Sequence, residues 1–208
     1  MLGDAALRVV DLGAGTGKFS RVLASLGHEV VAVEPDSGMR EQLAAVSPGV
    51  EVLAGSAEAI PLPDGTVDAV TAAQSFHWFD SAEARTEIAR VLRPGGVLAP
   101  VWNVRDDSVP WVAELSRAVL AGGRGSGDYS SGVELGPLFA QAERAEFRRS
   151  DEYTAASFLE FARSRSSYLT ADAAARARID AAVGAVTARL PETFELPYVT
   201  VAYRAVRA

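Results

Sequence analysis

The chain repeats one pattern between residues 8 and 101, in which a short apolar run is followed by a turn and then by a stretch with helical spacing. Strands and helices that alternate in this way predict βαβ units, whose right-handed crossovers build a parallel sheet. The expected strands are residues 8–12, 28–33, 50–54, 67–72 and 97–101. The expected helices are 18–26, a second from Asp36 or Ser37 to Val46, and a third that starts with Asp80 and Glu83 in a capping box and ends near Leu92.

The pattern changes after Asn103. Helical spacing returns at 109–120, 155–167 and 171–190, a glycine- and serine-rich loop covers 122–136, and strands are expected at 145–149 and 196–206. The last strand alternates apolar and polar residues, which favours an antiparallel position at the end of the sheet. We therefore predict an α/β fold with a Rossmann-like doubly wound sheet, mostly parallel with an antiparallel last strand, and helices on both faces. One domain, 1–208, is expected, with a ligand-binding half at 1–103 and a substrate-side half at 104–208.

Composition narrows the function classes. A formal net charge of −7 and a single lysine argue against a general affinity for nucleic acid, which relies on clustered basic residues. There are no cysteines, so thiolate chemistry and thiolate metal sites are excluded, and no metal site is expected. No apolar run of membrane-spanning length and no signal-peptide pattern occurs. We expect a cytoplasmic protein, monomeric or homodimeric, that acts on a small molecule without a membrane or nucleic-acid partner.

The segment Asp11–Gly17 reads DLGAGTG, and it follows the first strand and opens the first helix. Glycines at such a place allow a tight turn and let a ligand approach the main chain, while the helix start offers unpaired N–H groups. The dinucleotide fingerprint would require glycine at position 18, where Lys18 stands. The phosphate-binding P-loop would require glycine in place of Leu12 and serine or threonine in place of Phe19. The remaining pattern is an acidic residue followed by three glycines at alternate positions.

This pattern resembles the first motif of the class I methyltransferases that depend on S-adenosylmethionine (SAM). The similarity covers roughly residues 8–103 and includes segments 61–70 and 92–96. The resemblance implies SAM as cofactor and S-adenosylhomocysteine as product. It also implies that the loop wraps the methionine part of SAM with Asp11, Gly13, Ala14, Gly15 and Gly17.

The same resemblance assigns the rest of the cofactor site. Glu34, which ends the second strand beside Pro35, would accept hydrogen bonds from both ribose hydroxyls, a task that suits a carboxylate. Met39 would pack on the adenine. The turn with Ser56, Ala57 and Glu58 would contact the adenine edge; many relatives carry aspartate where Ser56 stands, and serine accepts a hydrogen bond less strongly.

The segment 73–80 follows the fourth strand and contains a His-Trp pair. It resembles a subgroup of type 11-like small-molecule methyltransferases that includes the trans-aconitate methyltransferases. The resemblance implies that the main chain of Ala73 and Gln74 contacts the methionine part, and that His77 and Trp78 face the methyl group or the substrate. Three roles stay open for His77: a structural hydrogen bond, positioning of the substrate, and general base. The aromatic residues of this segment can equally pack a helix onto the sheet.

The expected function is transfer of a methyl group from SAM to a small-molecule acceptor, either a carboxylate or a hydroxyl. Arg105 can pair with an anionic substrate, although a solvated surface position is the simpler expectation, and 163–168 can contribute to a substrate cap. Only seven residues precede Arg8, where the family usually has a helical segment over the cofactor. The alternatives are therefore a non-catalytic or weakly active SAM-binding protein and, less favoured, an NAD-dependent oxidoreductase.

Overall fold

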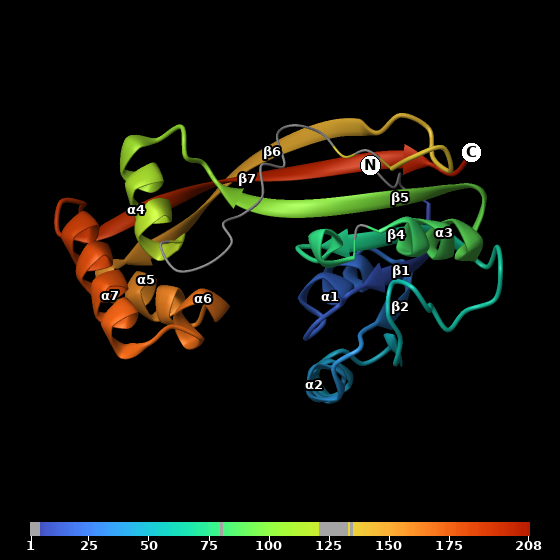
Figure 1. Ribbon diagram of the computed structural model, residues 1–208, viewed down its shortest axis with the longest axis horizontal. Coiled ribbons are helices and arrows are strands. Elements are labelled where there is room, and N and C mark those ends of the chain that lie inside the picture. Colours follow the sequence, from blue (N-terminus) through green and yellow to red (C-terminus); the bar gives the residue numbers. More distant parts are fainter. Residues whose placement is uncertain (1–4, 80, 121–132, 134) are drawn as a thin grey trace. The chain divides into compact units, whose positions relative to one another are not determined.

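The computed structural model describes residues 5–79, 81–120, 133 and 135–208 (Figure 1). Most of the glycine-rich loop expected at 122–136 lies outside these residues. The strands are β1 (Arg8–Leu12), β2 (Glu29–Val33), β3 (Glu51–Leu53), β4 (Val67–Ala73), β5 (Leu92–Arg105), β6 (Glu143–Thr154) and β7 (Thr193–Val206). The helices are α1 (Lys18–Ser25), α2 (Ser37–Val46), η1 (Phe76–Trp78), α3 (Ala82–Val91), α4 (Pro110–Leu120), α5 (Ala155–Arg163), α6 (Ser166–Leu169) and α7 (Ala173–Thr187). Within the described residues, no helix is both long and apolar enough to cross a bilayer.

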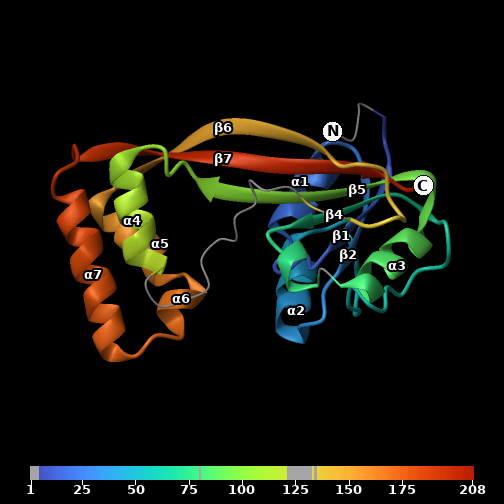
Figure 2. The same ribbon diagram turned by 45° about the horizontal axis from the view of Figure 1, so that its top comes forward.

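The seven strands lie in the order β3-β2-β1-β4-β5-β7-β6. The strands from β3 to β5 are parallel, and in this register Val10 pairs with both Val31 and Val70. All three side chains are fully buried, as expected for a parallel sheet that is covered on both faces. The order reverses between β1 and β4, so right-handed crossovers place α1 and α2 on one face and α3 on the other (Figure 2). The predicted doubly wound α/β fold is confirmed.

The last strand of the chain is not the edge strand. β7 lies between β5 and β6, and it runs antiparallel to β5, because Arg207 N donates to Gly96 O at 2.8 Å and Asp106 N donates to Pro197 O at 3.0 Å. The expectation that the last strand would end the sheet is therefore wrong. The edge belongs to β6, whose sequence ERAEFRRSDEYT is rich in charges, as exposed sheet edges commonly are.

The start of α3 also differs from the expectation. Ser81 caps this helix, since its Oγ accepts from Ala84 N at 3.0 Å, and the predicted cap Asp80 lies outside the described residues. The sequence left Asp36 and Ser37 as alternative caps of α2. In the structure Asp36 is the cap, because its Oδ1 accepts from Met39 N at 2.8 Å. Both caps satisfy an N–H group that the first helical turn leaves without an intrahelical partner.

The chain divides into two compact units. Unit 1 comprises 1–102, 129–145 and 201–208, and unit 2 comprises 103–128 and 146–200, each as far as the structure describes them. In unit 1, Leu23 of α1 packs on Val9, Val30 and Ala69 of the sheet. Unit 2 has its own apolar core, formed by Val112, Leu115, Phe158, Ala162, Ile179, Val183, Val186, Phe194, Leu196 and Tyr198.

Candidate cofactor pocket

The three positions of the loop after β1 require glycine for different structural reasons. Gly13, Gly15 and Gly17 have φ of 68°, 57° and 76°, in the left-handed region that favours glycine. A Cβ at Gly13 would lie 2.8 Å from the Cβ of Ser75, and one at Gly17 would lie 2.6 Å from Leu43 Cγ. A Cβ at Gly15 would have no atom of the described residues within 4 Å. Packing therefore requires glycine at Gly13 and Gly17, whereas Gly15 borders open space.

Glu34 follows β2 directly and is tied to this loop. Its carboxylate is almost fully buried; Oε2 accepts from Gly15 N at 2.9 Å and Oε1 accepts from Asp36 N at 3.0 Å. A carboxylate has about four acceptor positions, so each oxygen can accept a further hydrogen bond. The side chain is thus fixed in direction while part of its acceptor capacity remains for a ligand.

Asp11 lies behind the loop. Its side chain is 1% exposed, and Oδ2 accepts from Ser20 Oγ at 2.6 Å. Burial raises the pKa of Asp11 to about 6; the hydrogen bonds from Ser20 act in the opposite direction, and the charge of Glu34 adds slightly to the increase. Asp11 therefore joins the end of β1 to the first turn of α1.

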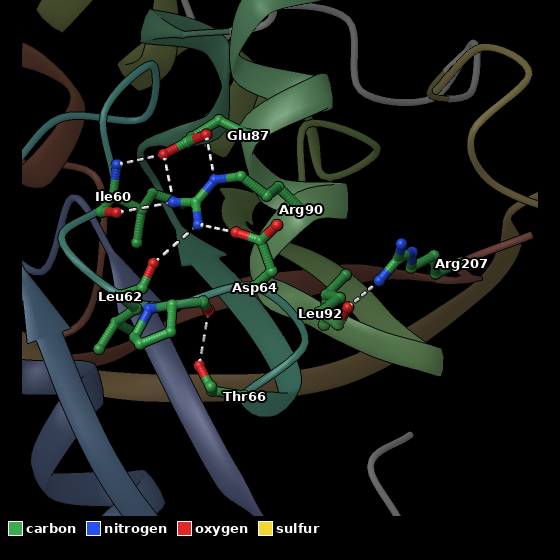
Figure 3. A network of polar contacts seen from close by, with 9 residues as sticks. Ile60, Leu62, Asp64, Thr66, Glu87, Arg90, Leu92 and Arg207 are labelled. Atoms are coloured by element: carbon green, nitrogen blue, oxygen red, sulfur yellow. Dashed lines mark hydrogen bonds and ion pairs between the residues drawn. The ribbon is translucent and has the colours of Figure 1, made fainter.

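The connection between β3 and β4 is held by two residues of α3 (Figure 3). Glu87 Oε1 accepts from Ile60 N at 2.9 Å, and Arg90 donates to Ile60 O at 3.0 Å and to Asp64 Oδ1 at 2.6 Å. Arg90 also pairs with Glu87 at 2.7 Å, and this hydrogen bond lowers the pKa of Glu87. The network fixes the connection that contains residues 56–58.

A pocket of about 490 Å³ opens in unit 1, where β1, β2 and β4 end. This edge is where the strand order reverses, which is the usual ligand position in open α/β sheets, and the volume suits a nucleoside-sized molecule. The lining residues are Leu12, Gly13, Gly15, Val33, Glu34, Pro35, Met39, Gly55, Ser56, Ala57, Glu58, Ala73, Gln74, Ser75, Trp78 and Phe79.

The lining includes most of the residues that the sequence suggested, but not all of them. Asp11, Ala14, Gly17 and His77 are not among the lining residues. Ala14 N donates to Val33 O at 3.3 Å, and Gly17 precedes α1 as its N-cap. Five further lining residues were not among the predicted ones, although each is next to a predicted residue or within two positions of one: Leu12, Val33, Gly55, Ser75 and Phe79.

The loop after β4 is built around a buried aromatic pair. Phe76 packs edge-on against Trp102 with ring centroids 6.2 Å apart, whereas Trp78 is 79% exposed beside the pocket. Trp102 Nε1 donates to His77 Nδ1 in a long hydrogen bond of 3.5 Å. Partial removal of its ring from water lowers the pKa of His77, so the neutral imidazole is favoured.

Gln74 has the backbone conformation least expected in this loop. Its φ is 58°, and among the described residues that are not glycine it alone has a positive φ. The N–H of Gln74 donates to Val101 O at 2.8 Å. Such conformations cost free energy and often occur at ligand sites. The bond to β5 holds the main chain of Gln74 at the pocket wall.

A doubly wound sheet with a glycine loop before α1, a carboxylate after β2 and a pocket at the reversal of strand order is the arrangement typical of α/β proteins that bind nucleoside-type ligands. A family model described as a methyltransferase domain matches residues 10–99. An uncharacterized methyltransferase of Mycobacterium bovis is 41% identical over 213 residues, with 100% of this chain and 86% of that protein covered. The chain therefore belongs to the methyltransferases, in the class I group that depends on SAM.

Another relative matches about half of the chain, and solved structures match most of it. A malonyl-[acyl-carrier protein] O-methyltransferase of Methylococcus capsulatus is 40% identical over 104 residues, which are 47% of this chain and 38% of that protein. Among solved structures, a protein of Anaeromyxobacter dehalogenans described as a type II methyltransferase is 27% identical, with a TM-score of 0.64 over 96% of this chain and 88% of that one. A structure from Anabaena variabilis, at 22% identity and a TM-score of 0.68 over 95% and 90% of the two chains, shares the fold.

Proposed function

We propose that the pocket of unit 1 holds SAM and that the protein transfers its methyl group to an oxygen of a small-molecule acceptor, a carboxylate or a hydroxyl. The observation that carries this proposal is Glu34, a buried carboxylate in the pocket wall with acceptor positions left over. A vicinal ribose diol offers two donors to such a carboxylate. The open space at Gly15 lets a ligand approach the main chain beside it.

The remaining pocket residues fit the other parts of the cofactor. Met39 is 46% exposed and offers an apolar surface to the adenine ring, and Ser56 can accept from the adenine amino group. The main chain at Ala73 and Gln74 is assigned to the methionine part. Trp78 and Phe79 bring aromatic faces to the pocket, which favour a cationic sulfonium.

When bound, SAM would supply an electrophilic methyl group to an oxygen nucleophile, with S-adenosylhomocysteine as the leaving thioether. The task of the protein is then to align the acceptor and to exclude water. A carboxylate acceptor is already ionised at neutral pH and requires no general base. The relative named as an O-methyltransferase of a malonyl group, whose free end is a carboxylate, supports an acceptor of this kind.

His77 is assigned to orienting the acceptor. Because the Trp102 N–H is directed at Nδ1, the neutral imidazole carries its proton on Nε2, where it can donate to an acceptor oxygen. The lowered pKa keeps the ring neutral at pH 7. A donor at this position holds a carboxylate or hydroxyl oxygen without removing a proton from it.

The test is transfer of an isotope-labelled methyl group from SAM to a panel of small carboxylic acids and hydroxylated metabolites. Once an acceptor is found, His77→Ala is expected to lower kcat/KM by roughly 10- to 100-fold, in keeping with the loss of one orienting hydrogen bond. His28→Ala is the matched control, because His28 is the other histidine of the chain and accepts from Leu7 N at 3.3 Å, away from the pocket residues. An unchanged kcat/KM in His77→Ala would remove the assignment of His77, and binding of NAD in place of SAM would remove the proposed function.

A further inference from the structure

Unit 2 contains a partly buried arginine whose side chain is fixed by a hydrogen bond. Arg105 is half-buried at the end of β5, and its Nε donates to Ser116 Oγ of α4 at 2.8 Å. Ser116 Oγ in turn donates to Asp107 Oδ1 at 2.7 Å. Burial lowers the pKa of Arg105. The expectation of a solvated surface arginine is therefore wrong, and the guanidinium is oriented by a hydrogen-bond chain.

Three further polar side chains lie near this guanidinium: Tyr153 of β6, Tyr198 of β7 and Arg165, which follows α5. Burial raises the pKa of Tyr198, and its hydrogen bond with Tyr153 acts in the same direction, so Tyr198 presents a neutral hydroxyl at pH 7. We call Arg105, Tyr153, Arg165 and Tyr198 the arginine–tyrosine cluster.

The two cations of the cluster lack the ion pairs that other arginines of unit 2 have. Arg163 pairs with Asp180 at 2.8 Å, and Arg149 pairs with Asp151. In the part of the chain that the structure describes, neither Arg105 nor Arg165 has a carboxylate oxygen within 4.0 Å. Asp107 contributes a negative charge nearby, but it is occupied by Ser116. A half-buried guanidinium without an ion pair is costly unless an anion joins it.

We propose that the arginine–tyrosine cluster binds the carboxylate of a small organic ligand. Both charged groups of the cluster are guanidinium groups, which only donate, so the complementary ligand group is an acceptor with negative charge. The planar fork of Arg105 matches the two oxygens of a carboxylate. This proposal concerns unit 2 alone and does not depend on the proposed function.

An organic acid fits the surroundings of the cluster better than an inorganic anion does. The ring of Tyr153 lies 5.6 Å from that of Phe161 and 5.4 Å from that of Phe158. Arg165 stacks over Phe161, with its guanidinium carbon 5.6 Å from the ring centre. Phe158 is fully buried, so the half-buried rings of Tyr153 and Phe161 are the ones that offer apolar contact to the carbon body of a monoanionic ligand, which phosphate does not have.

The test uses the full chain with benzoate as the probe, benzamide as its neutral isostere and inorganic phosphate as the alternative anion, measured by ligand-observed NMR. Benzoate is expected to bind, and benzamide and phosphate at least about tenfold more weakly, because each lacks either the charge or the apolar body. Arg105→Gln is expected to weaken benzoate binding by at least about tenfold, with a smaller loss in Arg105→Lys. Arg163→Gln is the matched control in the same unit and is expected to leave binding unchanged.

The outcomes separate this inference from the proposed function. Equal binding of benzoate by Arg105→Gln, or equal binding of benzamide or phosphate by the wild type, would overturn the carboxylate site. Titration with S-adenosylhomocysteine is run on the same samples and is expected to give the same affinity in Arg105→Gln. Loss of benzoate binding with intact nucleoside binding in Arg105→Gln, and a smaller loss in Arg105→Lys, which keeps the charge, show that the change is local to the cluster. Absence of nucleoside binding in the wild type contradicts the proposed function alone.

Discussion

The two units use different parts of the chain to build a site. In unit 1 the pocket depends on main-chain geometry: glycines with positive φ, and a carboxylate that accepts backbone N–H groups next to open space. In unit 2 the arginine–tyrosine cluster depends on side chains from β5, β6, β7 and the segment after α5. The family model matches only within unit 1, at residues 10–99. A site made of backbone conformation leaves a local sequence motif, whereas a site made of side chains from distant elements does not.

Substitution of a loop glycine tests most strongly whether the pocket of unit 1 depends on main-chain geometry. Gly17→Ala is expected to lower the free energy of unfolding by about 2–4 kcal/mol, because a Cβ would lie 2.6 Å from Leu43 Cγ and φ is 76°. The Cβ of Gly15→Ala would have no atom of the described residues within 4 Å, so this change is expected to cost only about 1–2 kcal/mol of stability and to weaken SAM binding instead. Denaturant unfolding and SAM titration of both variants check this. Equal stability losses would contradict the separate roles of the two glycines.

Asp11 gives the next largest effect, and it depends on pH. Its pKa is raised from 3.8 to about 6, so between these values the unfolded chain releases the proton first and stability falls as pH rises, by up to about 3 kcal/mol. Asp11→Asn keeps an acceptor for Ser20 but removes the titration. The unfolding free energy of the variant minus that of the wild type is therefore expected to increase from pH 4 to pH 6.5. Parallel profiles would show that burial does not raise the pKa of Asp11.

Gly184, in unit 2, is a glycine that neither packing nor a positive φ requires, and it can be compared with the loop glycines of unit 1. It lies on the exposed side of α7, and a Cβ there would meet no atom of the described residues within 4 Å. Because alanine favours a helix over glycine, Gly184→Ala is expected to stabilise the protein by up to about 1 kcal/mol. Thermal unfolding measures the change. A destabilised variant would mean that this glycine, like Gly17, has a packing role.

The sequence predicted the parts of the fold that depend on local pattern. Val10 and Val31 lie in apolar runs that were expected to be strands, and in the structure these runs are neighbouring buried strands. The position of β7 inside the sheet could not be predicted, because it depends on pairing with β5, about a hundred residues earlier in the chain. The helix cap at Ser81 was missed because Asp80 beside it is an equally suitable capping residue.

The candidate site likewise has parts that the local sequence predicts and parts that depend on residues far apart in the chain. The glycine loop could be located from its spacing, and Glu34 from the family resemblance that this spacing carries. Arg105 was expected in solvent, because nothing near it in the sequence indicates Tyr198 or Arg165. Only folding brings these residues together, so burial and charge there had to come from the structure.

The central claim is that Glu34 holds the ribose of SAM in the pocket of unit 1. The most direct measurement is calorimetric titration of S-adenosylhomocysteine into the wild type, Glu34→Gln and Glu41→Gln, the last as a control because Glu41 is an exposed residue of α2 that does not line the pocket. We predict a dissociation constant roughly 10- to 100-fold higher for Glu34→Gln and a change of less than about threefold for Glu41→Gln. Equal affinity of Glu34→Gln and the wild type would contradict the account.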